Sequence, residues 1–172
     1  MILRLRFGRW RITFTFAPVV DVIGVNSRLP DGNHIPMWDF DNVRLGTVIT
    51  ELERVQRTYN LPNIYILETK ENSNYIAYCF KRLPWRKVVE ILAYTRHLDW
   101  GYFRFGVYRG YFTLRVSPKC GRTPKLAWII KSRVPEDVYI TDLKSWVKYE
   151  TLQDGYKGRR IEIAPKRSSH DS

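Results

Sequence analysis

The spacing of apolar residues changes several times along this chain, and this pattern constrains the fold more than any other feature. Over residues 2–16 apolar and polar side chains alternate, which predicts a β-hairpin. Over residues 43–59 the apolar side chains recur every three or four positions, which predicts a helix. Two β-rich runs, 64–68 and 75–80, flank a polar turn and predict a second hairpin.

The rest of the chain continues this mixture of helix and strand patterns. Pro84 suits the first turn of a second helix, expected over 84–97. Aromatic and β-branched residues predict a long hairpin or bent strand over 102–116 and a strand over 125–130. A third helix is expected over 142–152. The remaining segments are loops (21–36 and 117–124) and a basic C-terminal tail (157–172).

A chain of 172 residues has the length of one ordinary domain, and we expect a single α+β domain over 1–156. With a short strand over 37–41, the element order becomes β-α-β-β-α-β, which ferredoxin-like, RRM and polymerase palm modules share. The expected fold class is therefore α+β, with an RRM/ferredoxin-like palm-type core, an added N-terminal β-hairpin and a C-terminal helix. This arrangement carries many functions, so it names none.

Positive charge is concentrated in one third of the chain. There are 29 Lys and Arg against 17 Asp and Glu, a formal net charge of +12. Residues 81–135 alone hold thirteen of the bases and two of the acids. Such a block attracts polyanions, although a solvated basic surface would show the same count. Aromatic residues interleaved with the bases favour nucleic acid, because bases stack on aromatic rings.

The most pointed local motif is a pair of carboxylates, Asp39 and Asp41, at the end of the expected strand over 37–41. Residues two apart on a strand project from the same face, so the two negative charges repel and a divalent cation would relieve the repulsion. Oxygen ligands of this kind suit Mg²⁺ or Mn²⁺ in nucleotidyl transfer. The alternative is that Asp41 caps the following helix and Asp39 is surface charge.

Around these two aspartates the chain resembles the catalytic module of archaeo-eukaryotic primases and primase-polymerases, over about residues 35–125. In that family a DxD motif ends a strand, as Asp39 and Asp41 do here. A Ser-x-His motif follows on the strand of the next hairpin, where this chain has Ser73 and Tyr75. Farther on, an Arg, a Ser and a Lys hold phosphates, which the segment 114–119 resembles. The resemblance implies DNA primase or polymerase activity.

Two positions depart from the pattern of that family. Tyr75 stands in place of the histidine of the second motif, and a phenol cannot donate to a triphosphate as an imidazole does. The aspartate of the third motif has one literal candidate, Asp99, but aligning residues 106–108 with the family's strand puts Arg104 there instead. An arginine at that place would attract phosphate and repel cations, which would turn a polymerase site into a binding site.

These observations lead to one main hypothesis and one alternative. The main hypothesis is a replication protein of the primase-polymerase type, with Asp39, Asp41 and Asp99 as catalytic residues and Asp39 and Asp41 as metal ligands. The alternative is a non-catalytic DNA- or RNA-binding protein of a virus or mobile element on the same fold. Expected partners are nucleic acid (DNA before RNA), nucleoside triphosphates and other replication proteins. The residues expected to contact nucleic acid or phosphate are Ser73, Tyr75, Arg82, Arg86, Lys87, Arg104, Arg109, Arg115, Ser117, Lys119 and Arg122.

A replication initiator and an RNA-processing endoribonuclease use related sheets. Initiators need a His-hydrophobic-His pair, but His34, His97 and His170 are isolated.

Cys79 and Cys120 suggest neither a zinc site nor a disulfide framework, which points to a reducing compartment. With no apolar run long enough for a membrane span or a signal peptide, we expect a cytoplasmic protein without a membrane partner.

Overall fold

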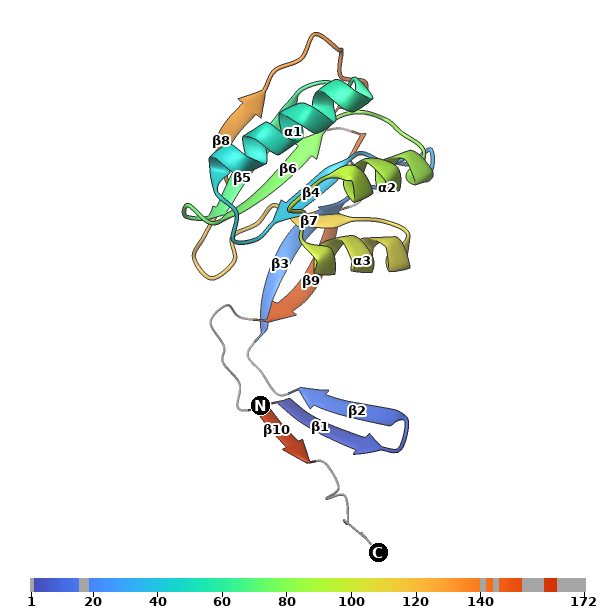
Figure 1. Cartoon of the computed structure of the whole chain (residues 1–172), viewed down its shortest axis with the longest axis vertical. Helices are drawn as coiled ribbons and strands as arrows, with labels where there is room; N and C mark the ends of the chain where they lie inside the picture. The colour runs from blue at the N-terminus through green and yellow to red at the C-terminus, as the bar shows by residue number, and fades with distance from the viewer. Residues whose placement is uncertain (1, 16–18, 140–141, 144–145, 153–159, 164–172) are drawn as a thin grey trace, which may run out of the picture. The chain divides into compact units, whose positions relative to one another are not determined.

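The computed structural model describes residues 2–15, 19–139, 142–143, 146–152 and 160–163. Helices and strands are mixed along the chain, which confirms the α+β class (Figure 1). In chain order the elements are β1 (Ile2–Phe7), β2 (Trp10–Thr15), β3 (Val19–Asn26), β4 (Met37–Phe40), α1 (Leu45–Tyr59), β5 (Ile64–Lys70), β6 (Asn74–Cys79), α2 (Trp85–Tyr94), α3 (Trp100–Arg109), β7 (Thr113–Arg115), β8 (Lys125–Ile130), β9 (Trp146–Leu152) and β10 (Arg160–Ile163).

The chain divides into two compact units. The first comprises residues 1–21 and 150–172, and the second comprises residues 22–149. In the first unit the expected N-terminal hairpin is present as β1 and β2, and β10 pairs with β1 in parallel. The sequence pattern suggested one domain over 1–156. The residue contacts instead group residues 1–21 with residues 150–172 in one unit and residues 22–149 in the other.

The second unit is built on a four-stranded sheet in the order β4-β6-β5-β8, and every pair is antiparallel. Helices α1 and α2 pack on one face of it. The predicted hairpin is confirmed as β5 and β6, and the predicted helices over 43–59 and 84–97 are confirmed as α1 and α2. No helix in the described segments is long and apolar enough to cross a membrane.

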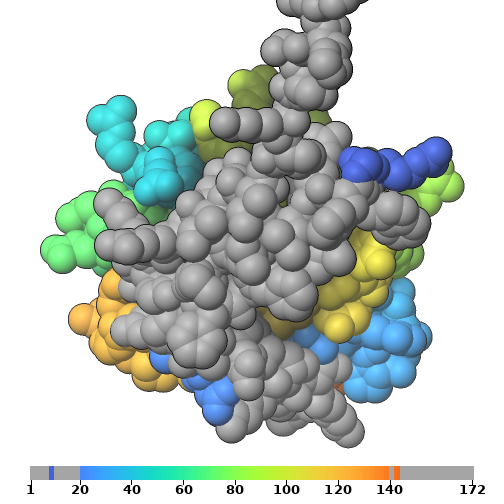
Figure 2. All heavy atoms as spheres, turned by 90° about the horizontal axis from the view of Figure 1, so that it is seen from below, coloured from blue at the N-terminus to red at the C-terminus, as the bar shows by residue number. Residues whose placement is uncertain are grey.

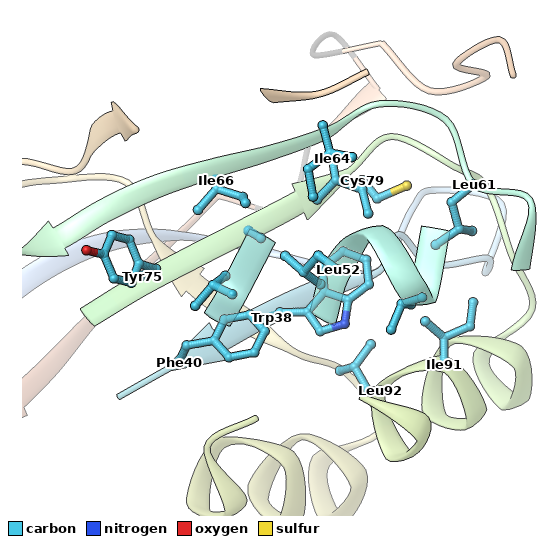
Figure 3. Packing of buried hydrophobic residues seen from close by; sticks show 14 of the residues in the cluster. Trp38, Phe40, Leu52, Leu61, Ile64, Ile66, Tyr75, Cys79, Ile91 and Leu92 are labelled. Atoms are coloured by element: carbon cyan, nitrogen blue, oxygen red, sulfur yellow. The ribbon is translucent and has the colours of Figure 1, made fainter. Parts of the chain in front are cut away.

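The larger core lies between this sheet and the two helices. Trp38 and Phe40 project from β4 toward Leu52 of α1 and Leu92 of α2, and all four side chains are fully buried (Figure 3). The Trp38 indole N–H donates to the hydroxyl of Thr95 at 3.0 Å, so its polar atom is satisfied. The alternation along β4 therefore assigns its even residues to the helix side and its odd residues to the opposite face.

A second, smaller core covers the opposite face of the sheet. There Met37, Ile76 and Tyr78 pack with Val25 of β3 and Leu114 of β7. Strand β3 lies between β7 and β9 in a three-stranded sheet, and Gly24 pairs with Arg115. The odd face of β4 is thus roofed by apolar side chains over part of its length, which partly buries Asp39.

The hairpin expected over 102–116 is wrong, because residues 100–109 form helix α3 and only 113–115 form a strand. Both ends of α3 carry the usual capping signals. The Asp99 side chain accepts the Tyr102 backbone N–H at 2.5 Å, and Gly110 adopts the left-handed conformation with φ of 79°. The aromatic residues of this segment suggested a strand. The two caps and the packing of the segment against the core stabilise a helix instead.

Two other expectations at the ends of the second unit are also wrong. Residues 146–152 form strand β9, where the sequence suggested a helix over 142–152. Part of the expected loop over 21–36 belongs to β3, whose residues 24–26 pair with β7. Both segments extend the sheet β7-β3-β9, and such long-range pairing is not visible in local spacing. The C-terminal tail expected over 157–172 includes strand β10. The other residues of this tail, 157–159 and 164–172, lie outside the described residues.

Candidate functional site

Asp39 lies on β4, and Asp41 follows directly after the strand ends at Phe40. Phe40, between them, faces the helices and is fully buried. Asp39 pairs across the sheet with Ile76 of β6 and is half-buried, whereas Asp41 is exposed. The strand pleat therefore places Asp39 on the face opposite the helices, and Asp41 stands in the turn beside it.

Asp99 reaches the same place from a distant part of the sequence. Its backbone N–H donates to the Asp39 carbonyl oxygen at 2.8 Å, which connects the start of α3 to β4. One oxygen of its side chain caps α3 through Tyr102. Residues 106–108 lie within α3, so the strand alignment that would put Arg104 in the third motif does not apply.

The charges of this cluster act on one another. Burial, followed by the charges of Asp41 and Asp99, raises the pKa of Asp39 to about 7, while Arg115 and Lys119 pull it down. We call Asp39, Asp41 and Asp99 the acidic cluster. Both acidic and basic side chains therefore act electrostatically on the Asp39 carboxyl.

Asn74, which the sequence analysis did not single out, is hydrogen-bonded to this cluster. Its side-chain amide donates to an Asp41 carboxylate oxygen, and its own oxygen accepts from the Ser73 hydroxyl at 2.5 Å. Ser73 thus reaches Asp41 through Asn74. The strand register contained the signal, because Asn74 stands two residues before Ile76, which pairs with Asp39.

Tyr75 lies on the opposite side of the sheet from the acidic cluster. It pairs with Phe40, is 2% exposed and belongs to the core beneath the helices (Figure 3). Its hydroxyl donates to a Glu68 carboxylate oxygen at 3.3 Å. The pleat of β6 therefore puts Tyr75 in the core, and Asn74 takes the place at the cluster that the sequence comparison suggested for position 75.

The Arg115 side chain joins two backbone segments through three carbonyl oxygens. Its guanidinium donates to the carbonyl oxygens of Ser117 at 3.2 Å, Arg122 at 3.1 Å and Thr69 at 3.2 Å. These bonds tie the loop after β7 to the β5–β6 hairpin. Since several guanidinium donors point at backbone oxygens, Arg115 contributes its charge to the site and shapes the loop that carries Lys119.

The loop over 116–124, which we call the basic loop, is fixed at both ends. The Ser117 hydroxyl accepts the Ile23 backbone N–H at 2.7 Å, and Lys119 and Arg122 exchange backbone hydrogen bonds at 3.0 Å. A polar cavity of about 430 Å³ separates this loop from the β5–β6 turn, and Figure 2 shows the two segments side by side in orange and green. Its charged lining residues are Glu68, Lys70, Glu71, Arg122 and Lys125.

Two of the three expected bases near α2 have acidic partners. Arg82 pairs with Asp31 and Asp142, and Lys87 pairs with Glu90 at 2.9 Å. Arg86 is exposed at the start of α2. Arg104 and Arg109 are exposed on α3, and the Arg109 guanidinium lies 5.4 Å from the Tyr111 ring centroid. The predicted bases therefore divide into the basic loop, the α2 start and the α3 face.

His34 has a structural place in the fold. It is 4% exposed, its Nδ1 lies 3.0 Å from the Ser27 hydroxyl, and its ring lies 4.8 Å from that of Trp85. Burial lowers the pKa of His34, so the ring is neutral at pH 7. The same Ser27 hydroxyl accepts the Phe112 backbone N–H at 3.0 Å. Ser27 and His34 thus join β3, α2 and β7, while His97 is exposed and His170 lies outside the described residues.

Replacing Ser27 by alanine is expected to destabilise the protein by about 1–3 kcal/mol, because it leaves the Phe112 N–H and the His34 Nδ1 buried and unsatisfied. Urea unfolding followed by circular dichroism measures the change. Ser132→Ala is the matched control, since that hydroxyl accepts one backbone N–H, from Val134, in a half-buried turn. An equal loss of unfolding free energy in both variants would contradict the special place of Ser27.

The acidic cluster has the donor chemistry of a magnesium or manganese site with two carboxylates. Asp39 and Asp41 supply hard oxygen ligands, and burial followed by repulsion from Asp41 and Asp99 raises the pKa of Asp39, a repulsion that a cation would relieve. Within the described ranges no group of three or more His, Cys, Asp or Glu side chains is positioned to hold a metal ion. Polymerase-type Mg²⁺ is held by one or two carboxylates together with substrate phosphates, so the pair fits such an ion.

The site is therefore an acidic cluster on β4 and α3 that faces Arg115 and the basic loop, with Asn74 beside it. Its chemistry suits a phosphorylated ligand held jointly by cations and basic side chains. The interpretation depends on these residues alone, because no family model, no curated protein and no solved structure matches the chain.

Proposed function

We propose that this protein binds nucleic acid and transfers nucleotides in the manner of a primase-polymerase, with its active centre at the acidic cluster. The observation that supports this most directly is the 2.8 Å hydrogen bond from the Asp99 N–H to the Asp39 carbonyl oxygen. It brings a third aspartate to the strand that carries Asp39 and Asp41. DNA is the expected nucleic acid, and nucleoside triphosphates and other replication proteins are the expected further partners.

We also propose that the sheet and its helices form a palm-type, RRM-like core. Supporting this are the order β4-β6-β5 and the position of α1 and α2 on one face of these strands. Strand β8 is an addition at the free edge of β5. In this arrangement the face opposite the helices carries the acidic cluster, where a palm presents its catalytic side chains.

Each side chain then has a distinct task. Asp39 and Asp41 would hold Mg²⁺ or Mn²⁺, and such an ion would supply positive charge opposite the phosphates of the substrate. Asn74 orients Asp41 through the amide hydrogen bond. Lys119 contacts phosphate, and Arg115 positions the basic loop through three backbone carbonyls. Asp99 keeps negative charge at the site and fixes α3 against β4.

The test is primer extension on a single-stranded template with deoxynucleoside triphosphates. The wild-type protein should extend the primer with Mg²⁺ or Mn²⁺ and not with EDTA. The double variant Asp39→Ala/Asp41→Ala should lose about a thousandfold in rate, because metal binding contributes several kcal/mol to such reactions. The loss should appear at saturating nucleotide concentrations.

Glu53→Ala is the matched control, because it removes an exposed acid of α1 whose ion pair with Arg57 spans 3.8 Å. Its extension rate should equal that of the wild type. Equal rates in the wild type and the Asp39→Ala/Asp41→Ala variant, with both proteins folded by circular dichroism, would contradict the proposed active centre.

A non-catalytic nucleic-acid-binding protein is the second candidate. The burial of Tyr75 favours it, because the residue that stands in place of the family's histidine then cannot contact a triphosphate at Asp39. This candidate expects binding without metal and a steep dependence on salt. Absence of extension together with metal-independent binding would select it.

A further inference from the structure

We propose that the outward face of helix α3 is a platform on which the unstacked bases of a single-stranded nucleic acid stack. Three aromatic side chains of the helix are largely exposed: Trp100 is 66% exposed, Phe105 60% and Tyr108 88%. Large aromatic side chains at such exposure are usually functional, because burial would otherwise stabilise the fold. This proposal takes from the proposed function only the assumption that the ligand is a nucleic acid. It does not depend on the metal site.

The exposed residues form one continuous stripe. Trp100, Arg104 and Tyr108 follow at intervals of four, so they lie on the same side of the helix. From the helical rise of 1.5 Å per residue, the stripe is about 12 Å long. Phe105 flanks it. An arginine lies between two aromatic rings, which combines a phosphate contact with stacking surfaces.

The opposite side of α3 holds the platform rigid. Gly106 packs against the ring of Phe112, and the Tyr102 hydroxyl donates to the Met37 carbonyl oxygen at 3.0 Å. The Trp100 ring lies 5.6 Å from that of Phe103, which limits its freedom. Rings already held in place lose little entropy when a ligand binds. Figure 2 shows the residues around 100–115, in yellow, at the surface on one side.

The charge around the stripe identifies the partner. Residues 100–135 contain eight Lys and Arg and no Asp or Glu, and Arg104 and Arg109 stand on α3 itself. A cationic aromatic surface complements a polyanion that also offers flat rings, which is a nucleic acid with its bases unstacked. A duplex keeps its bases paired, so the face should prefer single strands. Asp99, at the start of α3, connects this face to the acidic cluster.

The experiment measures the binding of a fluorescein-labelled single-stranded DNA oligonucleotide by anisotropy in EDTA, which leaves the metal site out. We expect Trp100→Ala and Tyr108→Ala to weaken binding by about tenfold each, the loss of one stacked base. Trp100→Phe and Tyr108→Phe keep a ring and should retain most of the affinity. Arg104→Ala should lower the slope of log K against log salt by about 0.7.

The matched controls are Trp128→Ala and Tyr139→Ala, which remove rings 51% and 71% exposed on other segments and should bind like the wild type. An RNA oligonucleotide of the same sequence separates RNA from DNA, and either preference supports the platform. Equal affinity for single strand and duplex, or unchanged affinity in the Trp100→Ala/Tyr108→Ala double variant, overturns it. The platform is also overturned if sedimentation shows that the wild type is a dimer, and if Trp100→Ala dissociates this dimer without changing the affinity for the oligonucleotide.

The result is separable from that of the extension assay. Loss of binding in the α3 variants without any primer extension by the wild type would leave the platform standing and remove the nucleotidyl transfer. Metal-dependent extension with unchanged binding in the α3 variants would remove the platform and leave the proposed function standing.

Discussion

Gly106→Ala is expected to destabilise the second unit by about 2–3 kcal/mol, and to lower its melting temperature by about 5–10 °C. A Cβ at this position would lie 2.1 Å from two ring atoms of Phe112, which is fully buried. That ring cannot move freely, because Trp85 and Tyr102 also pack on it, each with ring centroids 5.2 Å away. The overpacking outweighs the better helix propensity of alanine. Thermal unfolding followed by far-UV circular dichroism measures the effect.

The matched control is Gly46→Ala on α1, where an added Cβ meets nothing within 4 Å. This variant should be slightly more stable than the wild type, by about 0.5–1 kcal/mol. Equal stability of the two alanine variants would contradict the close packing of α3 on Phe112. Because α3 carries the exposed rings of the proposed platform, we expect Gly106→Ala also to weaken oligonucleotide binding.

Asp39→Asn is expected to stabilise the protein at pH 8 and to change its stability little at pH 4. The pKa of Asp39 is raised from its ordinary value of 3.8 to about 7 in the folded protein. Between these two values the folded state holds a proton that the unfolded chain has lost, so the unfolding free energy falls as the pH rises from 4 to 7. Asparagine cannot ionise, and the variant avoids this loss, which is of the order of 4 kcal/mol. Urea unfolding at several pH values measures the difference.

Asp31→Asn is the control of opposite sign. Hydrogen bonds from Asn33, and then Arg82, lower the pKa of Asp31 to about 2, so its carboxylate stabilises the folded state at neutral pH. This variant should be less stable than the wild type at pH 7 and approach it near pH 2. In addition, Mg²⁺ should stabilise the wild type at pH 8 and not Asp39→Asn, because a ligand stabilises only the state that binds it. A stability difference between Asp39→Asn and the wild type that does not vary with pH would contradict the burial of the Asp39 carboxyl among like charges.

Elements with local signals were predictable from the sequence. The 3.6-residue spacing identified α1, and the alternation with a polar turn identified β5 and β6. Strand β8 has the predicted bounds, 125–130. In each case the apolar pattern matches the face that the structure buries, so the local preference and the tertiary packing agree.

Helix α3 shows where local patterns fail. Its aromatic and β-branched residues favour strand, yet Asp99 and Gly110 provide a cap at each end, and these signals were outweighed in the sequence analysis. The segment buries only Gly106 fully, so it lacks a broad apolar stripe. The exposed aromatic residues made the segment resemble a strand in the sequence, and these are the side chains that we propose stack on bases.

The sequence by itself determined the α+β class and the concentration of positive charge over 81–135, because hydrophobic spacing and charge depend on neighbouring residues. Only the tertiary structure decided which third carboxylate joins Asp39 and Asp41, which residue of 73–75 faces them and which bases act on Asp39. The strand register and the docking of α3 set these contacts, and both depend on residues far apart in the chain.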